Sequence, residues 1–308
     1  MENKLHISVS PHIRSSITTR KIMLDVLIAL SPATIAGCVL FGLPAIWVII
    51  ACTASALSFE FIFNLITKRT QTAFDLSAVV TGILLALNLP ANTPIWQCVV
   101  GSAFAIIIVK CLFGGIGCNL VNPAITARVF MLFSFKNLAV PAFPVDSVSS
   151  ATPLVQLAEG QAVSLTDLFL GNVGGAIGET SALALLIGGV YLIARRVITW
   201  HMPVSMIGGV FVLSFLLDGF SFTNALSWIL SGGLFIGAFF MATDYVTSPS
   251  TPKGKIIFGL GAAVLTVLIR FYSIYPEGVS FAILFLNIVN PYIEQCSNRK
   301  LFGGKKYD

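Results

Sequence analysis

The sequence predicts an all-α polytopic membrane protein, with about ten transmembrane helices in a 5+5 inverted repeat that contains short broken helices. Three observations predict this class: a mean hydropathy of +0.92, a composition of 56% hydrophobic and 10% charged residues, and the placement of Lys and Arg between apolar stretches. Soluble domains carry about a quarter charged residues. Because this chain carries far fewer, its helices are expected to lie in lipid.

Apolar windows follow one another along the chain, with boundaries that hold to within several residues. They cover 22–42, 45–66, 75–90, 95–113, 122–135, 176–194, 203–218, 224–242, 256–273 and 279–296. Two of them, 75–90 and 122–135, are short for a bilayer that needs about 20 apolar residues, and Asn and Pro interrupt them. Such segments predict broken helices, which survive in lipid only where protein or a cavity satisfies their backbone.

Basic residues predict the orientation. With the N-terminus in the cytoplasm, 16 of the 18 Lys and Arg fall in cytoplasmic tails and connections, including Lys110 and Arg128, whereas Lys136 and Arg270 fall outside. We therefore expect a multi-pass protein of the cell membrane with both termini cytoplasmic. The expected divisions are a tail (1–21), a first five-helix repeat (22–135), an extracytoplasmic loop (136–175), a second repeat (176–296) and a tail (297–308).

Short matches between the halves predict the repeat. Residues 120–125 (LVNPAI) match 288–293 (IVNPYI) in the fifth span of each half, and 77–82 (SAVVTG) match 227–232 (SWILSG) in the third. A half with five spans ends on the opposite side of the membrane from where it began. A second copy of that half therefore inserts with the inverse orientation. Transport folds of this kind bind ligands and ions where their broken helices meet.

Ionisable residues within apolar windows are costly and often functional, although capping or snorkelling explains several near helix ends. Glu179, in GGAIGETSAL, begins the sixth span, and Asp244, in FFMATDYVTSPSTP, marks a break in the eighth. A carboxylate at either place can meet a cation or the polar edge of a flavin. The run GGIG at 114–117, followed by Asn119 and Asn122, predicts a loop that leads into a half-helix, whose N–H groups can hold a polar ligand.

Several other classes of function lack a signature. The sequence contains no dinucleotide fingerprint, Walker sequence, HExxH or GxSxG motif. The six cysteines lie mostly in apolar runs without metal-ligand spacing, which favours a structural role over a metal or iron–sulfur site. The net charge of +5 comes from residues that flank apolar blocks, so it indicates topology rather than nucleic-acid binding.

Four stretches, spread over nearly the whole chain, resemble one family. They are SPHIRSSITTRKIMLDVLIALSP, GGIGCNLVNPAITARV, GETSALALLIGG and AFFMATDYVTSPSTPKGK. They are similar to the D-subunit family of the Rnf complexes, which are ion-translocating ferredoxin:NAD oxidoreductases. The related B subunit of the sodium-pumping NADH:quinone oxidoreductase carries a longer N-terminal region, so the short N-terminus and the SPHIR sequence favour the Rnf family.

The resemblance implies covalent FMN, held through a phosphoester to a threonine. The family's pattern places an Asp six residues before that Thr, and Ser or Thr, a small residue and Ala directly before it. The matching residues are Asp146, Ser149, Ser150, Ala151 and Thr152. Ser147 and Ser150 stand where Gly is common, but both are small. Attachment needs an unhindered hydroxyl, and we expect Pro153 to stop the segment from continuing as regular structure.

The resemblance also implies a non-covalent riboflavin within the bundle, and Asn122, Glu179 and Asp244 are candidate cofactor-binding residues. The expected partners are the other Rnf subunits, including the extracytoplasmic FMN-bearing subunit and the cytoplasmic NAD-reducing subunit, together with Na⁺ or H⁺. The expected role is an electron relay that is not catalytic alone, so no catalytic acid or base is assigned.

Two alternatives are a non-redox channel of urea-channel-like architecture and a structural anchor. The SSAT run after Asp146 argues against both.

Overall fold

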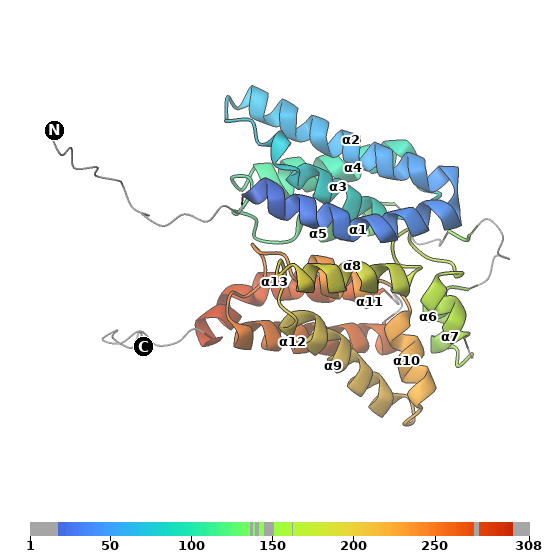
Figure 1. The fold of residues 1–308 in the computed structure, drawn as a ribbon. Helices are drawn as coiled ribbons and strands as arrows, with labels where there is room; N and C mark the ends of the chain where they lie inside the picture. The colour runs from blue at the N-terminus through green and yellow to red at the C-terminus, as the bar shows by residue number, and fades with distance from the viewer. Residues whose placement is uncertain are drawn as a thin grey trace, which may run out of the picture.

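A computed structural model describes residues 18–135, 138, 142–144, 151–161, 163–273 and 277–297. Within these residues the regular structure is helical (Figure 1). The first half holds α1 (Thr19–Phe41), α2 (Leu43–Ile66), the 3₁₀ turn η1 (Ala73–Asp75), α3 (Ser77–Leu87), α4 (Ile95–Ala103), its π-helical continuation η2 (Phe104–Cys111) and α5 (Pro123–Ser134). The rest holds α6 (Pro153–Ala158), α7 (Leu165–Leu170), α8 (Ala182–Ala194), α9 (His201–Leu217), α10 (Phe222–Leu230), α11 (Leu234–Ile236), the π-helical η4 (Gly237–Met241), α12 (Pro252–Tyr272) and α13 (Gly278–Ser297).

The helices begin where short polar side chains can cap them. The side chains that accept a hydrogen bond from the first turn belong to Thr18, Asn122, Thr152, Ser181, Ser221 and Thr251. These oxygens satisfy N–H groups that have no partner within the helix. Pro follows directly at the start of α5 and α12, where its missing N–H costs nothing.

Four helices, α1, α2, α12 and α13, are long and apolar enough to cross a membrane. A fifth candidate is the pair formed by α10 and the α11–η4 segment, which is bent by 65°. The remaining apolar helices, α3, α4–η2, α5, α8 and α9, are shorter. These elements follow the apolar windows of the sequence, which confirms an all-helical membrane protein; ten complete spans remain a prediction.

The sixth window was predicted to begin at 176, but α8 begins only at Ala182. The residues before it bind the end of α3 instead: the N–H of Gly178 donates to Leu87 O at 2.7 Å, and the N–H of Ile177 donates to Leu89 O at 3.0 Å. The short helix α3 ends inside the protein, so its last carbonyls need partners. Residues 177 and 178 supply two of these partners from a segment of turns that precedes α8.

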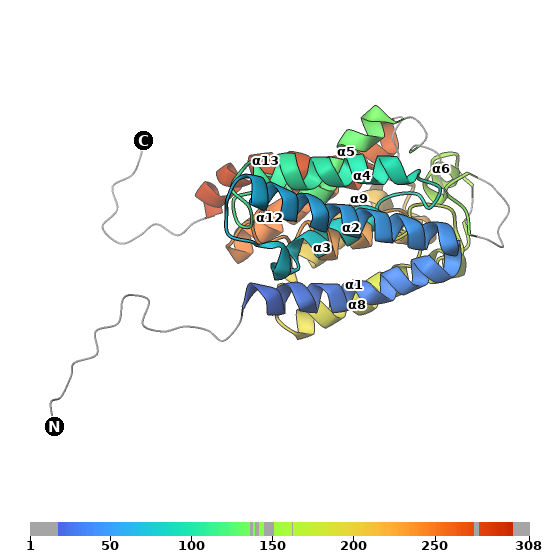
Figure 2. The ribbon, with the colours of Figure 1, turned by 90° about the horizontal axis from the view of Figure 1, so that it is seen from above.

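The two halves form two layers that meet along α1 and α8 (Figures 1 and 2). Gly188 of α8 allows this approach, because a Cβ at that position would lie 2.0 Å from Ala29 O of α1. At one end of the same helix pair, Asp25 accepts a hydrogen bond from the Tyr191 hydroxyl at 3.1 Å and pairs with Arg195 at 3.4 Å. Small residues and this polar group together fix α1 against α8.

The two Asn-Pro pairs that suggested a repeat occupy different local positions. Asn122 and Pro123 begin α5, whereas Asn290 and Pro291 lie inside α13. In the first half the pair caps a half-helix, and in the second it interrupts the hydrogen bonding of a long one. The sequence match therefore does not predict a matching backbone.

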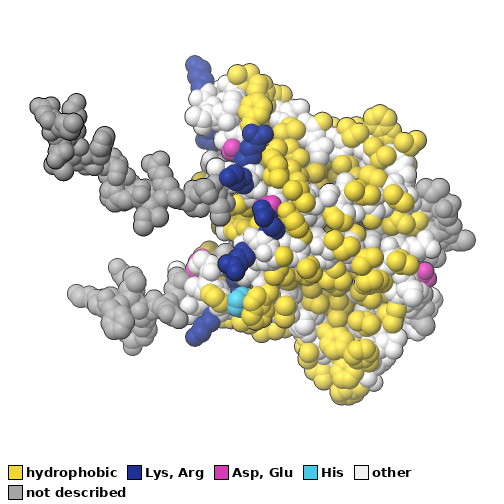
Figure 3. Space-filling view, in the orientation of Figure 1, with side chains coloured by type: hydrophobic (Ala, Val, Ile, Leu, Met, Phe, Trp, Pro, Cys, Tyr) yellow, Lys and Arg dark blue, Asp and Glu magenta, His cyan; other side chains and the backbone are white. Residues whose placement is uncertain are grey.

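Exposed basic residues gather at one end of the molecule, while apolar side chains cover most of the visible surface (Figure 3). We call this the basic end; its described residues are Arg20, Lys21, Lys68, Arg69, Arg195, Arg196 and Lys253. Helix α1 begins and α13 finishes at the basic end, and α6 and α7 lie at the opposite end, which we call the α6 end (Figure 1). Separation of charge from apolar surface is the pattern of a protein that spans a bilayer.

Arg128 was predicted to belong to a cytoplasmic connection with the other basic residues, and this is wrong. It is 2% exposed and binds Glu277, which precedes α13 and lies at the α6 end. Lys110 is also 2% exposed, so neither residue is a surface signal of topology. A count of charges in the sequence does not separate a solvated charge from one that is paired inside the fold.

Candidate functional site

A cavity of about 460 Å³, partly open to solvent, lies at the α6 end. It collects residues from distant parts of the chain. They include Arg128, Thr152, Glu179, Thr180, Ser231 and Glu277. The cavity therefore joins Thr152 to Glu179, both of which were predicted as site residues, and adds charged groups that the sequence did not indicate. Asp146, Ser149 and Ser150 lie outside the described residues, and Ala151 also lines this cavity.

Thr152 is half-buried and caps α6, where its hydroxyl accepts a hydrogen bond from the N–H of Val155 at 3.4 Å. The prediction that Pro153 stops regular structure is wrong, because α6 begins at this residue. Proline suits the first position of a helix, where no N–H is needed. The helix start fixes the backbone of Thr152 at the wall of the cavity.

Arg128 and Glu277 form an ion pair at the wall of the cavity, with 2.8 Å between Nη2 and Oε2. The other terminal nitrogen of Arg128, Nη1, is buried and has no hydrogen-bond partner among the described residues. A buried donor without a partner costs free energy, so this nitrogen can donate to a group that enters the cavity. Arg128 Nη1, which lacks a partner among the described residues, therefore belongs to a residue that lines the same cavity as Thr152.

The break between α10 and α11 lies beside this cavity. Arg270 donates to Trp228 O at 2.6 Å and to Ser231 O at 3.0 Å, which satisfies carbonyls that the break leaves free. Glu179 packs against the same break, since a Cβ on Gly233 would lie 2.6 Å from its Oε1. Glu179 thus lies within the protein, where a broken helix and a cavity meet.

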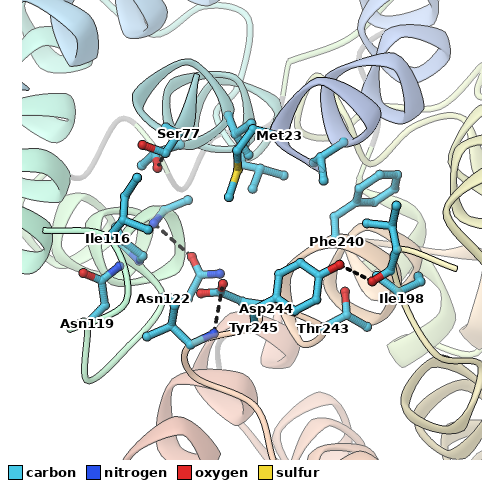
Figure 4. A pocket seen from close by; sticks show the side chains of 18 of the residues that line it. Met23, Ser77, Ile116, Asn119, Asn122, Ile198, Phe240, Thr243, Asp244 and Tyr245 are labelled. Carbon is cyan, nitrogen blue, oxygen red and sulfur yellow. Dashed lines mark hydrogen bonds between the residues drawn. The ribbon is translucent and has the colours of Figure 1, made fainter. Parts of the chain in front are cut away.

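A second, smaller cavity of about 110 Å³ lies toward the basic end, and Figure 4 shows its lining. Its wall contains Asn122 and Asp244, both predicted as site residues, together with Ser77, Lys110, Asn119 and Tyr245. Figure 4 shows Asn119 and Asn122 beside Asp244, with Ser77 and Met23 across the space. The predicted loop before α5 and the predicted break at Asp244 therefore do meet.

Hydrogen bonds hold Asn122 and Asp244 in place. Asn122 caps α5 through Oδ1 and donates from Nδ2 to Met241 O at 3.3 Å, so it joins α5 to the end of η4. Asp244 accepts from the Thr247 hydroxyl at 3.3 Å. Among the described residues, Asp244 has no ion-pair partner, and the buried Oδ1 of Asn119 has no hydrogen-bond partner. These oxygens remain available to a ligand.

The sequence did not predict the ion pair between Lys110 and Glu60, in which Nζ lies 2.7 Å from Oε2. Both side chains are at most 2% exposed. The residues are 50 positions apart, so no local spacing connects them. The available signal was a lone glutamate in an otherwise apolar helix, which must find a partner in lipid.

The comparisons with known proteins agree with these observations. The model of the NQR2, RnfD, RnfE family matches residues 6–303. The chain belongs to this family. Among the relatives, the D subunit of the Na⁺-translocating ferredoxin:NAD⁺ oxidoreductase complex of Acetobacterium woodii is 44% identical, over 99% of this chain and 97% of the relative.

Two other relatives of the family also match nearly end to end. The D subunit of the proton-translocating ferredoxin:NAD⁺ oxidoreductase complex of Clostridium ljungdahlii is 40% identical, over 99% of this chain and 98% of the relative. The D subunit of the ion-translocating oxidoreductase complex of Stutzerimonas stutzeri is 37% identical, over 94% of this chain and 93% of the relative. The resemblance of the four sequence stretches to the Rnf family is thereby confirmed.

Proposed function

We propose that this chain is the flavin-carrying membrane D subunit of an ion-translocating ferredoxin:NAD oxidoreductase complex. In this role it relays electrons across the membrane through FMN on Thr152 and a non-covalent riboflavin. Family membership supports the complex, and two cavities toward opposite ends of one bundle, each with several polar side chains in a mostly apolar wall, support the relay. The observation that carries the proposal is that one cavity is lined both by Thr152 and by Arg128, whose Nη1 has no hydrogen-bond partner among the described residues.

The residues of the α6-end cavity fit the FMN phosphate and ring. A phosphodiester on the Thr152 oxygen keeps a negative charge, and the free Nη1 of Arg128 can donate to it in a charge-assisted hydrogen bond. The cavity volume of about 460 Å³ leaves room for an isoalloxazine ring against Leu154, Leu168 and Leu230. Attachment raises the effective concentration of the flavin at this site and prevents its loss.

The side chains of the basic-end cavity match the chemistry of riboflavin, which has no phosphate and many polar edge atoms. Asn119, Asn122 and Asp244 offer amide and carboxylate groups, and Phe239, Phe240 and Tyr245 offer aromatic faces. Its enclosed volume of about 110 Å³ is below the usual range for cofactor pockets, so riboflavin binding requires the side chains of its wall to move apart. Flavins supply the electron transfer when bound, and these residues orient them and exclude water.

The 5+5 inverted repeat and the divisions at 22–135 and 176–296 belong to the proposal. The packing order supports them: α2 packs on α3 and α4, and α9 packs on α10 and α12. The pseudo-twofold axis that relates the two halves would pass near the contacts of α1 with α8 and of α5 with α13. We place the basic end and both termini in the cytoplasm, since Lys and Arg concentrate on that side of membranes. Residues 136–175, with Thr152, then face the exterior.

The proposed partners are the remaining subunits of the complex, with an FMN-bearing subunit outside and an NAD-reducing subunit in the cytoplasm. The moved ion is Na⁺ or H⁺; the relatives above include a complex named for each. Moving one charge against 100 mV costs about 2.3 kcal/mol, which downhill electron transfer must supply. Asp244, without an ion-pair partner in the described part of the chain, is our candidate contact for the ion.

Flavin fluorescence after denaturing electrophoresis tests the proposal. We expect a fluorescent band for the wild-type chain expressed with the flavin transferase, because a phosphoester survives denaturation. Thr152→Ala should remove the band. Thr166→Ala, which changes another exposed hydroxyl at the α6 end, should keep it. A band that persists in Thr152→Ala moves the attachment elsewhere, and no band in the wild type favours a non-redox channel.

A further inference from the structure

The ion pair of Lys110 and Glu60 extends into a longer hydrogen-bonded chain. Lys110 Nζ donates to Glu60 Oε2 at 2.7 Å and to Ser77 Oγ at 2.7 Å. Glu60 Oε1 accepts from the Thr72 hydroxyl at 2.6 Å, and that hydroxyl accepts from Asn64 Nδ2 at 3.0 Å. These short bonds join α2, α3, η2 and the loop before η1 into one polar network inside an apolar bundle.

The outer end of this chain reaches solvent at the basic end. Thr72 is half-buried and follows Arg69, Thr70 and Gln71, which are all exposed. Glu60 is 1% exposed, so the Thr72 hydroxyl stands between the carboxylate and water. A hydroxyl both donates and accepts, which suits it to pass a proton.

The inner end of the chain reaches the basic-end cavity, since Lys110 and Ser77 both line it. An ammonium group has three N–H donors. Two of those on Lys110 bind Glu60 and Ser77, and the third has no partner among the described residues. The π-helical turn of η2 carries Lys110, and such turns are frequent at functional sites.

Other charged groups around Lys110 are few. Glu60 faces it from α2, and Arg69 reaches the same region by donating to Cys111 O at 3.1 Å. Asp244 lies on the wall of the same cavity. Stability alone does not explain a buried ion pair at this position, because two apolar side chains of similar volume are often equally stable. The surrounding contacts instead connect the cavity to the surface.

We propose that Thr72, Glu60 and Lys110 deliver protons from the basic end to the flavin in this cavity, an inference that rests on the proposed function. When the relay reduces the flavin, an Nζ–H bond of Lys110 breaks and the proton goes to a ring nitrogen, whose new negative charge it neutralises. The Glu60 carboxylate takes a proton from the Thr72 hydroxyl, which takes one from water, and Glu60 then passes its proton to the neutral Lys110 amine. Thr72, Glu60 and Lys110 each return to their starting charge.

The test uses the intact complex with reduced ferredoxin, and it follows the rate of non-covalent flavin reduction in H₂O and in D₂O. Thr72→Val removes the hydroxyl and its bond to Glu60 and leaves both residues of the ion pair in place. We expect reduction to slow about tenfold or more and to become more sensitive to D₂O, since a positioned proton donor contributes about 10²–10⁴-fold. Thr72→Ser should restore the rate, and Thr67→Val, which changes an exposed hydroxyl bonded only to Phe63 O, is the control.

The amount of flavin that acid extracts from the complex distinguishes a failure of the proposed function from a failure of the proton path. No such flavin in the wild-type complex overturns the flavin proposed for this cavity and this inference with it. Bound flavin that is reduced at the wild-type rate in Thr72→Val overturns the proton path alone. If Thr72→Val does not assemble, the double variant Glu60→Gln/Lys110→Met replaces the ion pair with a neutral pair. An unchanged rate and isotope effect there would equally contradict the proton path.

Discussion

At the scale of single residues, Arg270 shows how a buried charge can support a broken helix. Its guanidinium donates to Trp228 O and Ser231 O, the carbonyls beside the break after α10. Arg270→Met should lower the free energy of unfolding by about 3 kcal/mol, because charge-assisted hydrogen bonds contribute about 1.5–3 kcal/mol each. The thermal unfolding temperature of the purified protein in detergent measures this loss.

Arg195→Met is the matched control for Arg270→Met. Arg195 is 58% exposed and pairs with Asp25 across 3.4 Å. Exposed ion pairs contribute about 0–1 kcal/mol, so this variant should unfold close to the wild-type temperature. Equal unfolding temperatures for the two variants would show that the break does not depend on the Arg270 contacts.

Individual site residues were predictable to different degrees. Thr152, Asn122, Glu179 and Asp244 stand in local sequences with unusual polarity, and the structure places each beside a cavity. Arg128 was misassigned because its partner Glu277 is 149 positions away. Long-range pairing depends on how helices pack, which a local pattern of charges does not contain.

At the scale of elements, the contact between α1 and α8 depends on one missing side chain. A Cβ on Gly188 would lie 2.0 Å from Ala29 O and 3.0 Å from Phe240 Cζ. Gly188→Ala should therefore force the helices apart and lower the free energy of unfolding by about 1–3 kcal/mol, the usual cost of overpacking. Urea or thermal unfolding in detergent measures the difference.

Gly208→Ala in α9 is the control, since nothing lies within 4 Å of the added Cβ. Alanine forms helix better than glycine by about 1 kcal/mol, so this variant should be as stable as the wild type or slightly more stable. If Gly188→Ala also proved neutral, the close approach of α1 and α8 would be wrong.

Hydropathy predicted the elements well where a helix is continuous and less well where it is interrupted. The windows at 22–42 and 256–273 agree closely with α1 and α12. The window at 176–194 was too long, because it includes residues that pair with the end of α3. Apolar composition does not distinguish an extended segment from a helix when both are buried.

At the scale of the whole molecule, the protein is one bundle with two different ends. The basic end carries exposed Lys and Arg and the cavity with Asp244, and the α6 end carries Thr152. Composition and charge placement predicted the membrane class and the polar ends. They did not predict the cavities, which arise where helix ends from both halves meet.

Mass spectrometry of the proteolytic fragment that contains Thr152, taken from an active complex, tests the flavin relay most directly. We expect this fragment to carry the mass of FMN joined as a phosphoester, and we expect fragmentation to assign it to the Thr152 oxygen. An active complex in which Thr152 is unmodified would contradict the relay.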